Sequence, residues 1–269
     1  MKKYLVVLVA VLMALLPVVS MAESAKAPIV LEGAMDCESQ LMMDALENPL
    51  NETIGGYHFV TGTLDGYPVV VIKTQVGMVN CATVTTLAIE RYKPLCVINQ
   101  GTAGGHDPAL HQWDIVLGES VSNINAFKSA HLDDGAGMAP ETWEWMLTET
   151  FIDGEWKDND ALKGDAALLK IAQGVAYEKG KLVSGVIGSG DVWNKEIDRI
   201  QLIHDAFNTA CEEMETYAAA QVCQMLNVPF LGIRVLSNSE LHAENFDYLT
   251  ALACQEYTLN VARAIIAAQ

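Results

Sequence analysis

Basic residues are scarce in this sequence. Its 269 residues include 16 lysines and arginines against 34 aspartates and glutamates, a formal net charge of −18. This balance argues against the phosphate backbone of nucleic acids and against an anionic membrane surface as partners. A small neutral ligand in a protected pocket is compatible with it, and the excess of acidic residues is otherwise typical of a solvating surface.

Repeats and linkers are also missing. The sequence shows no heptad run, no repeat of about 20–50 residues and no linker rich in Pro, Gly or Ser, which excludes coiled coils and solenoids. Hydrophobic residues make up 51% of the chain and charged residues 19%, which excludes intrinsic disorder. A chain of this length can bury about 70–75% of its unfolded surface. We therefore expect one folded domain over residues 23–269.

The first 22 residues are predicted to be a signal peptide. Lys2 and Lys3 form a charged start, residues 4–16 are apolar, and the segment ends in Ser-Met-Ala with cleavage expected after Ala22. An uncleaved anchor is the alternative, although the apolar run is short for a bilayer span of about 20 residues. We expect an exported protein, periplasmic or secreted, that is free of the membrane after cleavage.

The six cysteines form no CxxC pair, and no histidine lies near them at the spacing of zinc ligands. Export would permit disulfides, but the cysteine spacings do not resemble a disulfide framework. Cys96 lies in an apolar strand pattern and Cys223 in an apolar helix pattern, where a free thiol behaves as a small hydrophobic group. We therefore expect mostly buried thiols and no metal site.

Strand patterns alternate with helix patterns along the chain. Strands are expected at 29–31, 58–63, 67–74, 95–99, 114–117, 182–187 and 229–235, and helices at 36–46, 79–92, 165–179 and 248–268, with a further helix that 210–213 lead into and that runs to about 226. This alternation predicts an α/β sheet with helices on both faces. The acidic, Trp-containing segment 133–160 has little periodicity and is expected to be a surface excursion.

Polar and glycine-rich segments follow several of these strands. Ligands of open α/β sheets bind beyond the carboxyl ends of the strands, so these exits are the places to search. The exits read GAMDCE at 33–38, QGTAGG at 100–105, GSGDVWN at 188–194 and SNS at 237–239, and EME at 213–215 opens a helix. The glycines match neither the dinucleotide fingerprint nor the phosphate-binding P-loop. Taken singly, each segment also suits an ordinary turn, a helix start or a core aromatic.

Taken together, these segments resemble the methylthioadenosine/S-adenosylhomocysteine nucleosidase family of the nucleoside phosphorylase superfamily. The specific matches are INQGTAGG at 98–105 and EME at 213–215 followed by RVLSN at 234–238. The resemblance covers the chain from about Ile29 to its end. It implies a three-layer α/β/α fold with a central mixed, twisted sheet. It also implies a homodimer that cleaves the N-glycosidic bond of a purine nucleoside, giving free base and ribose or 5-substituted ribose, without cofactor.

The resemblance assigns roles to three polar side chains. Glu38 matches the carboxylate that activates water beside the anomeric carbon. Glu215 matches the carboxylate that accepts the ribose 2′ and 3′ hydroxyls. Asn238 stands where the family has an aspartic acid that protonates purine N7, with Ser237 orienting it. Both Glu38 and Asn238 are thus candidate catalytic residues.

The resemblance also implies the walls of the pocket. Trp193 matches the aromatic that stacks on the base, and the backbone of Asn194 would meet its Watson–Crick edge. Thr102 and Gly104 match the floor. The remaining expected contacts are at the sugar and its 5′ substituent, from Met35, Glu213, Met214 and Phe246. The Phe246 match is loose, because 239–245 departs from the family pattern.

Asparagine at 238 predicts a change of base preference. An amide can donate a hydrogen bond but cannot give up a proton, which suits the more acidic 6-oxopurine leaving groups. Superfamily members that act on inosine, guanosine or futalosine are similarly asparagine-like at this place. An amide can also pair with adenine N7 and N6, so adenine cleavage and a catalytically weak binder stay open.

Water is favoured over phosphate as the nucleophile. Phosphorolysis needs cationic groups, commonly arginines at the first and third strand exits, and residues 33–38 contain none. Glu38 would also repel a phosphate dianion. The alternatives are a phosphate-dependent purine nucleoside phosphorylase and a secreted non-catalytic protein that only binds nucleosides.

Overall fold

The computed structural model describes residues 26–152, 154–159 and 161–269, so the predicted signal peptide lies outside the described residues. Ten strands form one sheet, in the order β11-β6-β12-β13-β5-β1-β4-β3-β2, with β14 paired to both β5 and β6. The strands of this sheet are β1 (Ile29–Gly33), β2 (Glu47–Ile54), β3 (Tyr57–Leu64), β4 (Tyr67–Lys73), β5 (Cys96–Gly105), β6 (Ile115–Asn123), β11 (Leu162–Lys163), β12 (Leu182–Ser189), β13 (Thr209–Glu213) and β14 (Phe230–Asn238).

The sheet is mixed. β1 is parallel to β4 and β5, and β14 is parallel to β5, so these strands end at the same edge. β13 runs antiparallel to β5, and β14 antiparallel to β6. Because β12 joins β6 to β13, the strands β5, β14, β6, β12 and β13 close into a ring. The predicted mixed, twisted sheet of an α/β fold is confirmed.

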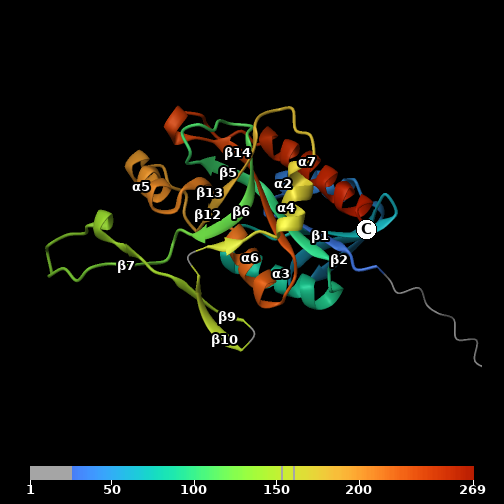
Figure 1. Ribbon diagram of the computed structural model, residues 1–269, viewed down its shortest axis with the longest axis horizontal. Coiled ribbons are helices and arrows are strands. Elements are labelled where there is room, and N and C mark those ends of the chain that lie inside the picture. Colours follow the sequence, from blue (N-terminus) through green and yellow to red (C-terminus); the bar gives the residue numbers. More distant parts are fainter. Residues whose placement is uncertain (1–25, 153, 160) are drawn as a thin grey trace, which may run out of the picture.

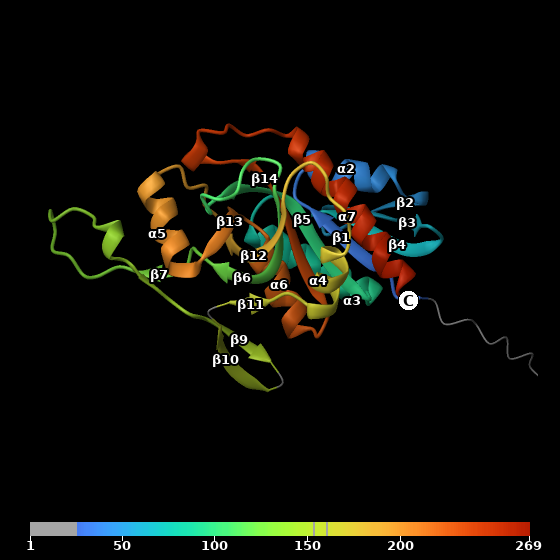
Figure 2. The same ribbon diagram turned by 45° about the horizontal axis from the view of Figure 1, so that its top comes forward.

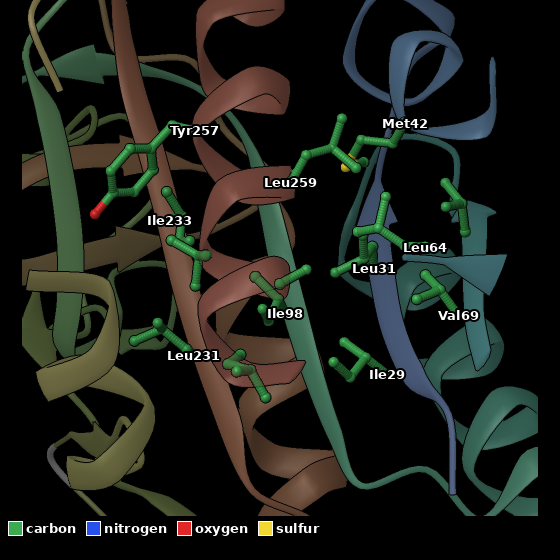
Figure 3. Packing of buried hydrophobic residues seen from close by; sticks show 14 of the residues in the cluster. Ile29, Leu31, Met42, Leu64, Val69, Ile98, Leu231, Ile233, Tyr257 and Leu259 are labelled. Carbon is green, nitrogen blue, oxygen red and sulfur yellow. The ribbon is translucent and has the colours of Figure 1, made fainter. Parts of the chain in front are cut away.

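Helices cover both faces of the sheet (Figures 1 and 2). On one face α2 (Asp36–Asp44), α4 (Ala166–Gln173) and α7 (Leu249–Ala267) pack together, and on the other α3 (Met78–Tyr92) packs on α6 (Thr216–Met225). Beside β13 lies α5 (Ile197–Phe207). Figure 3 shows the first of these interfaces, where Met42 and Leu259 meet β-strand residues such as Leu31, all of them almost fully buried.

Local sequence explains the elements that were expected. Asp65 and Gly66 join β3 to β4 with φ values of +51° and +73°, the positive values that a tight two-residue hairpin turn needs. Every residue of β1 and β14 is buried, in keeping with their apolar runs. Asp165 caps α4 by accepting from the backbone N–H groups of Ala167 and Leu168.

Several boundaries differ from the sequence-based expectation. β5 continues through the glycines to Gly105, so 100–105 is strand rather than loop. Residues 209–213 form the strand β13 rather than a lead into the next helix. The helix expected at 165–179 ends at Gln173, and that expected at 36–46 ends at Asp44. β2 and α5 were not predicted.

The segment 133–160 is an excursion, as predicted, but it carries structure. β7 (Phe127–Lys128) pairs with β8 (Glu144–Trp145), and β9 (Thr148–Ile152) pairs with β10 (Glu155–Asn159). A short 3-10 helix lies at Pro140–Thr142, and a second at Glu240–His242 follows β14. Both views show β7 and the β9–β10 pair projecting from the layered body. Trp145 anchors the excursion by packing edge-on against Phe207 at the end of α5.

All six cysteines are free thiols, five of them buried and Cys37 half-buried. Burial raises the pKa of the buried thiols, for example that of Cys96 to about 12, which makes them unreactive core groups. Across residues 26–269 outside positions 153 and 160, no helix combines the length and the apolar character that a bilayer crossing requires.

Candidate active site

Glu38 is held rigidly at the end of β1. It lies in the first turn of α2 and is 3% exposed. Its Oε2 accepts from the backbone N–H groups of Ala34 and Met35, both at 3.1 Å, and its Oε1 accepts from the N–H and the hydroxyl of Thr102, both at 2.8 Å. A Cβ on Gly101 would lie 2.8 Å from Oε1, so only glycine leaves room for this carboxylate. Thr102 of β5 thus contacts Glu38 directly, and Met35 reaches it through its backbone N–H.

Glu215 lies at the start of α6 and reaches across to α3. Its Oε1 accepts from the backbone N–H of Gly77 at 2.8 Å, and its Oε2 lies 4.0 Å from Nη2 of Arg234. Burial and the neighbouring Glu213 raise the pKa of Glu215 to about 8, against the lowering effect of Arg234. The charge of Glu38 acts in the same raising direction, which places the two carboxylates in one electrostatic cluster.

Glu213 is turned toward Arg234 rather than toward an open pocket. Its Oε2 accepts from Nη2 at 2.5 Å and from Nε at 3.1 Å, and its carboxylate also accepts from the backbone N–H groups of Glu215 and Thr216. Burial opposes ionisation, but Arg234 and these donors hold the pKa of Glu213 below its usual value. Arg234 donates further to the backbone and side chain of Asn99. Glu213 and Arg234 thus form a buried ion pair next to Glu215.

Asn238, Gly104 and Glu212 form one row across three strands. Gly104 of β5 pairs with Asn238 of β14 on one side and with Glu212 of β13 on the other. A Cβ on Gly104 would lie 3.4 Å from Nδ2 of Asn238 and 3.7 Å from Cγ of Glu212, so both side chains stand on the same face. The glycine thus forms a floor between two polar walls, at strand spacings of about 4.8 Å each.

The Asn238 amide is oriented by its neighbour. The hydroxyl of Ser237 lies 3.0 Å from Oδ1 of Asn238 and donates to it. This leaves Nδ2, the atom nearer to Gly104, as the donor that faces the floor. Both side chains are buried, Asn238 at 5% exposure. The structure therefore brings Ser237 and Asn238 together in the manner expected.

Glu212 is a site residue that sequence reasoning missed. Its Oε1 accepts from the backbone N–H of Asn194 at 2.8 Å, and its Oε2 accepts from Nδ2 of the same residue at 2.5 Å. On its other side, Nε2 of His106 lies 3.2 Å from Oε2, and His106 is 1% exposed. Nδ1 of His106 lies 2.9 Å from Thr209 Oγ1. A local signal was lacking, because His106 is distant in the sequence.

Two partly exposed aromatic rings meet where the loops after β12 and β14 approach each other. Trp193, from the loop after β12, is 54% exposed, and Phe246, from the loop after β14, is 42% exposed. Their ring centroids are 6.2 Å apart at an interplanar angle of 59°. They come from segments distant in the chain and meet, which supports their assignment as walls of one pocket. Met214 is half-buried between Glu213 and Glu215.

A separate hollow lies beside α5. It has a volume of about 660 Å³ and is lined by residues such as Glu141, Lys195 and Arg199. None of its lining residues is among the buried carboxylates Glu38, Glu212, Glu213 and Glu215. The chemistry is concentrated at the strand ends described above and not in this hollow.

Comparisons with known proteins agree with this fold and these residues. The sequence profile of the Phosphorylase superfamily matches residues 28–268, nearly all of the described chain. The chain therefore belongs to this superfamily of mixed α/β proteins. Relatives within it are more specific. A 5′-methylthioadenosine/S-adenosylhomocysteine nucleosidase of Bacillus thuringiensis (strain Al Hakam) is 35% identical over 213 residues, 77% of this chain and 83% of the relative.

Solved structures point to the same group. The nucleosidase of that name from Colwellia psychrerythraea 34H, in complex with adenine, matches with a TM-score of 0.72 and 26% identity, over 89% of this chain and 96% of that one. The enzyme from Neisseria meningitidis, in complex with methylthio-immucillin-A, matches with a TM-score of 0.73 and 25% identity, over 88% and 99%. The chain is a member of the 5′-methylthioadenosine/S-adenosylhomocysteine nucleosidase family.

Proposed function

We propose that the protein is a purine nucleoside hydrolase that prefers 6-oxopurine nucleosides. Cleavage of the N-glycosidic bond is the chemistry of its family, to which the sequence and the solved relatives assign it. The observation that carries the hydrolase proposal is the buried Glu38 carboxylate, fixed by donors from the segment after β1 and from Thr102 within β5, and the base preference rests on Asn238. The base preference, the individual roles below and the choice of water as nucleophile are our inferences.

Glu38 is proposed to take a proton from the attacking water. Its carboxylate accepts four hydrogen bonds, about the capacity of a carboxylate. The Thr102 hydroxyl is the adjustable donor, because it rotates freely and can accept as well as donate. We propose that it yields one position on Oε1 to the water. The oxygen of this water then bonds to the anomeric carbon as the purine departs with the bond electrons.

Glu215 is proposed to hold the ribose. It must be ionised to accept two hydroxyl donors, yet in the free protein its pKa of about 8 keeps it largely protonated at neutral pH. Hydroxyl donors favour the ionised form and replace part of the solvation lost on burial. Arg234, held by Glu213 beneath it, supplies the compensating positive charge. Glu213 is thus proposed to act by holding Arg234 in place.

Asn238 is proposed to stabilise the departing base. As the glycosidic bond breaks, negative charge develops on the purine, and Nδ2 of Asn238 can donate to N7 or to O6. A donated hydrogen bond suits an acidic 6-oxopurine, whereas adenine benefits from a full proton. Arg234, the arginine of this cluster, has its donors taken by Glu213 and Asn99, which favours water over phosphate.

The test is a comparison of inosine and adenosine with the purified protein and its Glu38→Gln variant. We expect a higher kcat/KM for inosine, and a loss of about 10²–10⁴-fold in kcat for Glu38→Gln. An equal or higher kcat/KM for adenosine would refute the base preference. Full activity in Glu38→Gln would refute the role of Glu38.

Export and dimerisation are further proposals, supported by the composition of residues 1–22 and by the family resemblance. N-terminal sequencing of the protein from its native host should begin at Glu23. Light scattering of the mature protein should give twice the mass of one chain. An intact N-terminus or a monomer mass would contradict the respective proposal.

A further inference from the structure

The base end of the site carries a second, unassigned polar side chain. Glu212 follows Cys211 in β13 and is 5% exposed, yet it touches the residue expected at the Watson–Crick edge of the base. It stands in the same row as Asn238, on the same face of the sheet, with only Gly104 between them. A purine edge lying over Gly104 would therefore meet an amide on one side and a carboxylate on the other.

Glu212 changes the hydrogen-bonding polarity of this edge. The backbone N–H of Asn194 is the donor that would read an unprotonated ring nitrogen, such as N1 of adenine. Here that N–H donates to Oε1 of Glu212 at 2.8 Å, and the Asn194 side chain donates to Oε2. The edge thus presents a carboxylate acceptor in place of a free donor. A carboxylate accepts about four hydrogen bonds, so acceptor capacity remains on it.

The two classes of purine differ in this respect. N1 of adenine is an acceptor, whereas N1 of a 6-oxopurine carries a hydrogen and donates. We propose that Glu212 is a specificity-determining residue that accepts the N1–H of a 6-oxopurine, while Asn238 reads N7 and O6 across Gly104. An adenine amino group could also donate to Glu212, but its N1 lone pair would then face a carboxylate oxygen. This inference rests on the proposed function and names the group that reads its substrate.

His106 lies next to Glu212. Its Nε2 lies 3.2 Å from Oε2, and its ring is fixed through Nδ1 by Thr209. Because Glu212 is buried and Asn194 donates to both of its oxygens, the carboxylate is preorganised and does not need to be drawn from solvent. A buried acceptor of this kind strongly disfavours a ligand that leaves it unpaired.

The test is calorimetric binding of the free bases hypoxanthine and adenine to the mature protein, to Glu212→Gln and to Asp165→Asn. Glutamine keeps the size and offers a donor for adenine N1. Asp165→Asn makes the same chemical change at the cap of α4, beside Phe230 at the opposite end of β14. Asparagine caps a helix as well as aspartate does, so this control should keep the base preference.

We expect the wild-type protein to bind hypoxanthine at least about tenfold more tightly than adenine, and Glu212→Gln to lower this ratio by about 10–100-fold. Tighter adenine binding by the wild type, or an unchanged ratio in Glu212→Gln, overturns the proposal. If Glu212→Gln does not fold, 1-methylhypoxanthine replaces it as a probe of the wild type. Loss of binding by at least about tenfold supports N1–H recognition, and equal binding refutes it.

The role proposed for Glu212 and the proposed hydrolase activity are tested by different measurements, so one can fail while the other stands. If the protein binds hypoxanthine in preference to adenine and Glu212→Gln lowers that preference, but no base is released from inosine, the hydrolase proposal fails and the role of Glu212 stands. If it hydrolyses inosine and adenosine equally and Glu212→Gln has no effect on the binding of either base, the hydrolase activity stands, while the base preference and the role of Glu212 both fail.

Discussion

Replacing Gly101 by alanine should disable the chemistry without removing any functional group. The new Cβ would lie 2.8 Å from Oε1 of Glu38, 3.1 Å from its Cδ and 3.3 Å from its Oε2. Ordinary contacts begin at 3.4 Å, so the carboxylate must retreat by about 0.6 Å. Four donors at 2.8–3.1 Å resist this movement, because each of their hydrogen bonds lengthens with it.

A misplacement of about 1 Å at a reacting group costs about 10²-fold in rate. We therefore expect Gly101→Ala to lower kcat on inosine by about 10–100-fold, with an overpacking cost of about 1–3 kcal/mol in the free energy of unfolding. Gly104→Ala is the matched comparison, because its Cβ would lie at an ordinary 3.4 Å from Nδ2 of Asn238. It narrows the base floor, so it should raise KM more than it lowers kcat.

The assay is steady-state release of hypoxanthine from inosine, with thermal unfolding measured alongside. A folded Gly101→Ala protein with kcat within about twofold of the wild type would refute the placement of Glu38 at the reacting centre. The same loss of kcat in both glycine variants would show that the two positions do not separate chemistry from base binding.

Three further predictions concern the polar network. The ionised fraction of Glu215 increases as pH rises through about 8, so kcat/KM should rise over the same pH range. This pH-dependent rise should be absent in Glu215→Gln, and an unchanged rise in the variant would assign it to another group. Arg234→Met removes one partner of a buried ion pair and should lower the free energy of unfolding by about 3–5 kcal/mol in urea titrations, and a loss under about 1 kcal/mol would contradict the stabilising role of the pair. Ser237→Ala removes a buried hydroxyl that bonds Oδ1 of Asn238 and the backbone oxygen of Ala103, so kcat on inosine should fall by roughly 5–30-fold and the free energy of unfolding by about 1–3 kcal/mol. An unchanged kcat would show that the amide needs no orientation.

Much of the fold was predictable because its elements obey simple patterns. β1, β4, α3 and α7 were expected nearly at their observed bounds, since their apolar runs and periodicities are strong. β2 escaped prediction because its sequence, ENPLNETI, is mostly exposed and lacks an apolar alternation. α5 was overlooked although IDRIQLIHDAF repeats isoleucine at helical spacing, and its buried Ile200 and Ile203 follow that signal.

Tertiary contacts explain the remaining differences. Glycines usually mark turns, but Gly101 and Gly104 lie inside β5, where the lack of a side chain leaves room for Glu38 and Asn238. The acidic end of β13 does not look like a buried strand. It is buried because Arg234 compensates Glu213, and because Asn194 donates to both carboxylate oxygens of Glu212.

The candidate site was likewise predictable where it depends on local sequence, and not where it depends on tertiary contacts. The sequence located the exits that carry Glu38, Trp193 and Asn238, because ligands gather at strand ends and the motifs lie there. It could not locate Glu212 or His106, because the two residues are far apart in the chain and come together only in the folded protein. Glu213 stays a predicted substrate contact, and the structure adds that its carboxylate accepts hydrogen bonds from Arg234.

The most direct test of the hydrolase proposal is inosine cleavage in phosphate-free buffer made with ¹⁸O-labelled water. If Glu38 activates water, hypoxanthine should be released and the ribose should carry one ¹⁸O atom at its anomeric carbon. Added phosphate should then change neither the rate nor the product. Release of hypoxanthine only after phosphate is added, with ribose 1-phosphate as the second product, would contradict the role of Glu38.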